Sequence, residues 1–234
     1  MVYDIIGLFF YQIRTIYFNK GLICGMFYFV KTPWVLKKLY KDCTWEMPAT
    51  KEKLLYLSFD DGPHPEITPF VLDELKKYNA KATFFCIGKN VVAYPETYRR
   101  IVEEGHGVGN HTNNHLNGWR TDDDIYMDNI KEASNYIDSD LFRPPYGRIT
   151  KFQLRLLKGR GWGLKTIMWS ILSGDFDKKC SPEQCLGNVI GNAKNGSIIV
   201  MHDSEKAFTR LRYALPEMLK ILSDKGFQFE KIKA

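Results

Sequence analysis

Short apolar runs and amphipathic stretches alternate along most of this chain of 234 residues. The short runs are typical of buried strands, and the longer stretches have the periodicity of helices that cover a core. About seven strands alternating with helices predict an α/β fold with a parallel sheet, either a barrel or a wound sheet. The expected strands are 54–57, 82–87, 106–110, 141–142, 163–169, 196–201 and 227–232, and the expected helices are 34–40, 68–78, 91–104, 122–137, 150–160, 182–193 and 211–225.

Two adjacent aspartates, Asp60 and Asp61, follow the first apolar run, 54–57, and precede a Gly-Pro pair that breaks the strand. Carboxylates placed side by side at a turn repel each other and lose solvation. A cation bound to one of them would remove most of that cost. Taken alone, the stretch is also compatible with a solvated turn, because aspartate and glycine favour turns.

Further polar clusters follow later strands, at the edge where the catalytic groups of α/β barrels gather. Among them, His111 and His115 lie four residues apart, so a helix or tight turn would present both rings to one side. Two imidazoles and one carboxylate would form a three-ligand site with open coordination positions, as in catalytic zinc sites. Zinc is favoured by this ligand set, and cobalt or nickel fits the same ligands.

Charge and cysteine content restrict the partners and the compartment. The net charge is +6, from 33 basic and 27 acidic residues, and the basic residues are spread along the chain. No basic helix or basic patch with interleaved aromatics is present, so a nucleic-acid partner is not expected. The five cysteines are sparse and lack metal-site or disulfide spacing. We therefore expect reduced thiols, which favours a cytoplasmic location.

The N-terminal segment allows more than one interpretation. Its apolar runs, 5–13 and 21–30, are both shorter than the roughly 20 residues of a spanning helix. No basic region followed by a cleavage site is present, so a cleavable signal peptide is not expected. Residues 1–30 would give either weak membrane association or an apolar helix packed on the domain, and Met26 is an alternative start. The location is thus expected to be cytoplasmic or membrane-associated.

Five stretches in this order resemble the motifs of the NodB-type polysaccharide deacetylases, carbohydrate esterase family four: SFDDGP, HTNNH, RPPYG, GDF and IIVMHD. The likeness extends from Lys53 to Lys231, so we assign 53–234 to one such domain and 1–52 to an apolar segment and lead-in. The resemblance implies a distorted (β/α)7 barrel. It also implies metal-dependent removal of N-acetyl groups from a glycan or glycoconjugate that contains N-acetylglucosamine.

The motif positions also imply roles for individual residues. Asp61, His111 and His115 would hold the metal. Asp60 would be the general base and His202 the general acid. These roles suit the residue types, because a carboxylate can accept a proton from water and a histidine can protonate an amine near neutral pH.

Supporting roles follow from the third and fourth motifs. The resemblance implies that Arg143 steadies the base and that the backbone N–H of Tyr146 faces the developing oxyanion. The fourth motif departs from the usual W-x-x-D-x-x-D-W, since Leu172 and Phe176 replace an aspartate and a tryptophan. Asp175 is the charge left there, and it would pair with either Arg143 or His202.

Other functions share these features. The same site could cleave another ester or amide, such as acetylated xylan or a small cyclic amide. A glycan-binding module without catalysis is a further alternative, although such a module would be expected to have lost a base, a ligand or an acid. Trp119 and Trp169 would either stack on sugar rings or pack in the core or rim.

Overall fold

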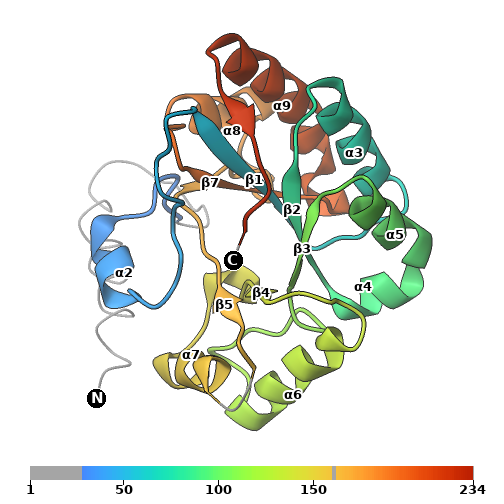
Figure 1. Ribbon diagram of the computed structural model, residues 1–234, viewed down its shortest axis with the longest axis vertical. Helices are drawn as coiled ribbons and strands as arrows, with labels where there is room; N and C mark the ends of the chain where they lie inside the picture. The colour runs from blue at the N-terminus through green and yellow to red at the C-terminus, as the bar shows by residue number, and fades with distance from the viewer. Residues whose placement is uncertain (1–27, 160–161, 234) are drawn as a thin grey trace.

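The structure is a computed structural model that describes residues 28–159 and 162–233. Within these residues, seven strands form one curled sheet in the order β5-β4-β3-β2-β1-β7-β6, and β8 pairs with β1 beside it. Neighbouring strands are parallel throughout. Helices cover the outside of the curled sheet (Figure 1). The predicted α/β fold of the distorted barrel type is confirmed.

Strands and helices alternate along the chain, as expected. The strands are β1 (Leu54–Asp60), β2 (Ala82–Cys86), β3 (Gly107–Asn110), β4 (Leu141–Phe142), β5 (Lys165–Thr166), β6 (Ile171–Leu172), β7 (Ile198–His202) and β8 (Gln228–Phe229). The helices are α2 (Trp34–Leu39), α3 (Ile67–Lys77), α4 (Gly88–Ala93), α5 (Pro95–Glu103), α6 (Asp123–Ser134), the short 3₁₀ helix η1 (Pro145–Gly147), α7 (Lys151–Lys158), α8 (Pro182–Ile190) and α9 (Glu205–Asp224).

Several element boundaries differ from the prediction. The helix expected at 91–104 is two helices, because Tyr94 leaves the helical region and Pro95 starts α5. The strand expected at 163–169 shrinks to the two residues of β5, and β6 is a separate strand. α9 begins at Glu205 rather than at residue 211, because its first turns already bury Ala207 against the core.

Alternation along β1 decides which side chains enter the barrel. Leu55, Leu57 and Phe59 belong to the large cluster beneath the outer helices. The intervening residues Ser58 and Asp60 therefore point to the inner face, because side chains alternate across a strand. The end of β1 thus directs one carboxylate into the barrel interior.

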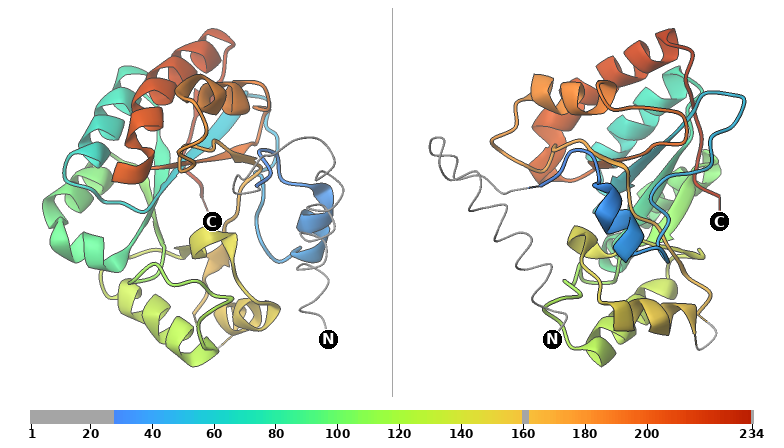
Figure 2. Two further views of the ribbon diagram at one scale, coloured as in Figure 1. Left: turned by 180° about the vertical axis from the view of Figure 1, so that it is seen from behind. Right: turned by 90° about the vertical axis from the view of Figure 1, so that its left-hand side faces the viewer.

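The lead-in crosses the open side of the sheet between β5 and β6 (Figure 2). Thr44 forms an isolated bridge with Ile167 next to β5, and Lys31 forms one with Ile171 of β6. Trp45 is 9% exposed and packs in a second cluster with residues of α6 and α7. Residues 28–52 therefore form part of the barrel wall.

The predictions for residues 1–27, including membrane association, the start at Met26 and Cys24, lie outside the described part of the chain. Across 28–159 and 162–233, no helix is both long and apolar enough to cross a membrane. The remaining cysteines, Cys43, Cys86, Cys180 and Cys185, are buried free thiols, as predicted.

Candidate active site

Asp61 lies in a tight turn directly after β1. It has a left-handed backbone conformation, with a φ of 82°. The Gly62 N–H donates to Asp203 Oδ1 at 3.0 Å, and Asn90 Nδ2 donates to the Asp61 carbonyl at 2.8 Å. A Cβ at Gly62 would lie 2.1 Å from Asp203 Oδ2, so no other residue fits there. The turn sends Asp61 away from Asp60 and toward the histidines that follow β3.

His111 and His115 lie in a turn rather than a helix. Thr112 and His115 have φ values of 62° and 57°, which close the turn tightly. Asn129 on α6 anchors it, since its Oδ1 accepts the N–H of Asn113 at 3.0 Å. The two imidazole rings are 5.1 Å apart. Of the two conformations that the sequence left open, the structure has the tight turn.

Three ligand atoms converge at the end of β1 and β3. Asp61 Oδ1 is 3.8 Å from His111 Nε2 and 3.2 Å from His115 Nε2, and the three atoms lie within 4.8 Å of one another. His111 Nδ1 is 2.7 Å from the Arg143 carbonyl, to which it donates as a neutral ring. Its pKa is lowered by burial to about 4, which leaves the Nε2 lone pair available at neutral pH.

The surroundings of this cluster fit a divalent cation. Asp61 Oδ1 is buried and has no hydrogen-bond partner among the described residues. Such an oxygen is costly unless a cation or donor compensates it. His115 Nδ1 lies 3.1 Å from the Tyr146 hydroxyl, so its Nε2 can also serve as a ligand. A carboxylate with two neutral imidazoles is a donor set that zinc, cobalt and nickel accept.

Asp60 is paired with Arg143 inside the barrel. Arg143 is 0% exposed, and its Nη1 donates to Asp60 Oδ1 at 2.7 Å and to Ser58 Oγ at 2.7 Å. Its Nε and Nη2 donate to the carbonyls of Ile167 and Met168, both at 3.1 Å. Burial lowers the pKa of Arg143, but a guanidinium remains protonated in proteins. The carboxylate is thus charge-compensated and held in one orientation.

His202 is paired with Asp175. His202 Nδ1 is 2.7 Å from Asp175 Oδ1, and the His202 N–H donates to Asp175 Oδ2 at 2.7 Å. Burial alone would lower the pKa of His202, but the Asp175 charge and hydrogen bond, with Asp61 and Asp60, raise it to about 10. The question left open by the sequence is answered, because Asp175 contacts His202 whereas Arg143 contacts Asp60.

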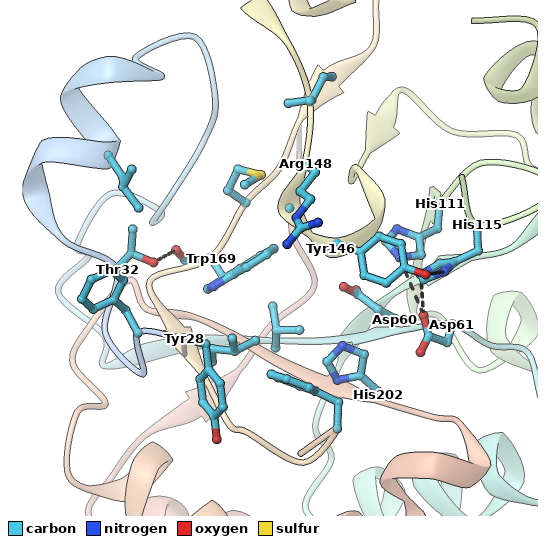
Figure 3. A pocket seen from close by; sticks show the side chains of 18 of the residues that line it. Tyr28, Thr32, Asp60, Asp61, His111, His115, Tyr146, Arg148, Trp169 and His202 are labelled. Atoms are coloured by element: carbon cyan, nitrogen blue, oxygen red, sulfur yellow. Dashed lines mark hydrogen bonds and ion pairs between the residues drawn. The ribbon is translucent and has the colours of Figure 1, made fainter. Parts of the chain in front are cut away.

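The Asp61, His111 and His115 cluster, Asp60 and His202 line one cavity of about 1030 Å³, and Arg143 and Asp175 lie buried behind it (Figure 3). Asp60, Asp61, His111 and His115 lie at one end, and His202 faces them. Both residues that depart from the fourth motif line the cavity and make its wall apolar beside His202. The other aromatic lining residues are Tyr28, Phe29, Tyr40, Trp45, Trp119, Tyr146 and Trp169.

The eight predicted site residues are therefore brought together. Sequence analysis missed the residues that hold the two ligand turns, chiefly Asp203 and Asn129. Asp203 is buried, accepts from Thr68 Oγ1, and has a pKa raised by burial to about 7. Its position directly after His202 was a signal, but nothing local indicated that it would reach Gly62.

Comparison with known proteins gives the family. The family model for polysaccharide deacetylase matches residues 48–162. A peptidoglycan-N-acetylglucosamine deacetylase of Bacillus cereus is 35% identical over 192 residues, 80% of this chain and 89% of the relative. The chain belongs to the polysaccharide deacetylase family. This confirms the predicted family and the predicted enzyme class, a hydrolase of the polysaccharide deacetylase type.

Solved structures of the family share the fold. The crystal structure of the Bc1960 peptidoglycan N-acetylglucosamine deacetylase superimposes with a TM-score of 0.77 and 32% identity, covering 86% of this chain and 95% of that one. The peptidoglycan deacetylase PdaC of Bacillus subtilis gives a TM-score of 0.69 and 32% identity, with 78% and 89% covered. Each of these two structures aligns with a larger part of this chain than residues 48–162, which the family model matches.

Proposed function

We propose that this polysaccharide deacetylase is a metal-dependent enzyme that removes N-acetyl groups from a glycan or glycoconjugate containing N-acetylglucosamine. The carrying observation is that the buried Asp60 carboxylate lies beside the Asp61, His111 and His115 cluster. The His202 imidazole, held by Asp175, faces them across the same cavity. Relatives named for peptidoglycan and chitooligosaccharide support the substrate class.

The metal would be held by Asp61 Oδ1, His111 Nε2 and His115 Nε2. A bound divalent cation would polarise the acetyl carbonyl and make water a stronger nucleophile near neutral pH. Zinc is favoured, with cobalt or nickel as alternatives. The hydrogen bonds from the two Nδ1 atoms fix both rings, so the cluster keeps its shape before the substrate enters.

Asp60 acts as the general base. Its carboxylate accepts one proton from the attacking water as the new carbon–oxygen bond forms to the acetyl carbon. Arg143 keeps Asp60 in place through the 2.7 Å contact, and its charge also balances the buried carboxylate. The backbone N–H of Tyr146 donates to the oxygen that becomes negative at this stage.

His202 acts as the general acid. As the carbon–nitrogen bond breaks, the imidazolium donates its Nε2 proton to the leaving amine, giving a free amino sugar and acetic acid, which loses its proton to water as acetate. Asp175 holds Nδ1–H and stabilises the imidazolium. Asp60 then gives its proton to water and His202 takes up a proton from water, which restores both groups for the next turnover.

Acetate release tests this proposal. Purified protein would be assayed with chitin oligomers, peptidoglycan fragments, a nucleotide sugar of N-acetylglucosamine and O-acetylated xylan, after chelation and after adding zinc, cobalt or nickel. We expect release that needs metal and leaves a free amine on the sugar. Release only from O-acetylated xylan would instead assign the site to the esterase alternative. Binding of glycans without any release would favour the non-catalytic module.

A further inference from the structure

Arg148 is a half-buried cation that lines the active-site cavity and has no counter-charge within the described part of the chain. Its guanidinium points into the cavity next to Trp169 and Tyr146 (Figure 3). No carboxylate in 28–159 or 162–233 pairs with it, and its side chain contacts one ring, that of Trp119, at 5.4 Å. Of the other buried or half-buried charges that line the cavity in the described residues, Asp60 is paired with Arg143 and His202 with Asp175, and Asp61 belongs to the ligand cluster. A partly desolvated cation without a counter-charge costs free energy, and an anionic ligand would remove that cost.

The position of Arg148 is set by the backbone around it. Its N–H donates to the Pro145 carbonyl at 3.1 Å, which fixes the residue at the end of η1. Trp119 Nε1 donates to the Ile149 carbonyl at 3.1 Å, so the ring under the guanidinium is also held. A Cβ at Gly118 would lie 2.6 Å from the Arg148 carbonyl, so this approach requires glycine.

A second cation, Lys206, lines the same cavity. Its ammonium lies 5.8 Å from the centre of the Phe176 ring, and no carboxylate of the described residues pairs with it. The acidic residue beside it, Glu205, instead faces His64 at 3.6 Å. Away from the catalytic end, the described residues of the cavity thus carry two cations, Arg148 and Lys206, against one carboxylate, Glu205, and this excess of positive charge attracts anionic ligands.

We propose that Arg148 binds an anionic substituent of the glycan, a carboxylate or a phosphate, while the acetyl group lies at Asp60 and His202. This inference rests on the proposed deacetylation. The planar guanidinium matches both oxyanions through two parallel hydrogen bonds. Trp119 offers an apolar face beside it on which a sugar ring can stack. The preferred substrate is thus an acidic glycan rather than a neutral chitin oligomer.

The test uses substrates that differ in one charge. Peptidoglycan strands without stem peptides carry a lactyl carboxylate, and the same strands with that carboxylate methyl-esterified are the neutral match. Arg148→Gln should lower kcat/KM on the acidic strands by about 10-fold or more, mainly through KM, and leave the esterified strands unchanged. Arg148→Lys should retain part of the preference. Arg120→Gln is the matched control, because Arg120 is exposed and does not line the cavity.

A second pair of substrates distinguishes phosphate binding from carboxylate binding. A nucleotide sugar of N-acetylglucosamine carries phosphate, and the methyl glycoside of the same sugar is its neutral match. A selective loss in Arg148→Gln on the nucleotide sugar alone identifies phosphate, and a loss on the strands alone identifies carboxylate. Equal losses on charged and neutral partners would overturn the inference, as would a wild-type protein that does not discriminate between them.

A binding measurement tests the anion site independently of the proposed deacetylation. In an Asp60→Asn background, calorimetry would measure the affinity for acidic and esterified strands with and without Arg148→Gln. A preference for acidic strands that disappears with Arg148→Gln supports the anion site even if no acetate is released by the parent protein. Equal affinities in all four combinations would remove the anion site while leaving deacetylation untouched.

Discussion

The half of the curled sheet with longer strands and the half with shorter strands position different groups of the site. β1, β2, β3 and β7 are 4 to 7 residues long, whereas β4, β5 and β6 have 2 residues each. Asp60, Asp61, His111 and His202 end or follow long strands. Arg143 follows β4 and Asp175 follows β6. The long strands thus carry the groups that would react, and the short strands carry the groups that orient them.

The difference has a physical basis. Long paired strands fix backbone position through many consecutive hydrogen bonds, so they suit atoms whose positions matter to within tenths of an ångström. The short strands need help from the lead-in, which pairs beside β5 and β6. This half also carries Trp169, Leu172 and Phe176 of the cavity wall. We therefore expect changes in the long-strand half to abolish chemistry, and changes in the short-strand half to tune it.

The largest effect is expected from Asp61→Ala. The change removes one of three ligands, so bound metal should fall well below one equivalent and acetate release by about 10³-fold or more. Elemental analysis beside the assay measures both. Full metal content together with full activity would show that Asp61 is not a ligand.

The next largest effect is expected from Asp60→Asn, which is nearly isosteric. Metal should stay near one equivalent, because all three ligands remain, while turnover drops by about 10²-fold or more through loss of the base. The same metal analysis serves as its control. If this variant loses metal while Asp61→Ala keeps it, the roles of the two aspartates are reversed.

A smaller effect, and one that depends on pH, is expected from Asp175→Asn in the short-strand half. Asp175 is the main group raising the pKa of His202 to about 10, so its neutralisation should lower that pKa. His202 acts while protonated, so activity is lost as the pH rises through its pKa. The alkaline limb of kcat/KM should move down by about one unit or more. An unmoved limb would mean that another group sets it.

The smallest effect is expected in the lead-in, from Thr32→Val. Thr32 Oγ1 donates to the Trp169 carbonyl at 2.7 Å. Its loss should cost about 1 kcal/mol of folding stability, a fall of a few degrees in melting temperature, with metal content unchanged. Thr50→Val is the matched control, since that hydroxyl makes an exposed bond of the same length. Equal melting temperatures for both variants would show that the lead-in contributes little here.

Sequence alone determined the order of strands and helices, the family and the identity of the residues in the site. These follow from local patterns: apolar periodicity marks buried strands, and short motifs place polar residues just after them. Local patterns were weakest where strands are short. Two-residue β4 was predicted at its observed position, but the strand expected at 163–169 became two-residue β5 and the separate β6 was missed, because two residues carry too little periodicity to fix a boundary.

Only the tertiary structure decided which charged groups pair. Arg143 and Asp175 could have paired with each other, since both lie after short strands, but the curl of the sheet puts Arg143 beside Asp60 and Asp175 beside His202. It also decided that Asp203 holds the Asp61 turn through Gly62, 141 residues away, and that Arg148 lies in the cavity with no carboxylate partner among the described residues. Such pairings depend on distances between residues far apart in the chain, and a local pattern contains no information about those distances.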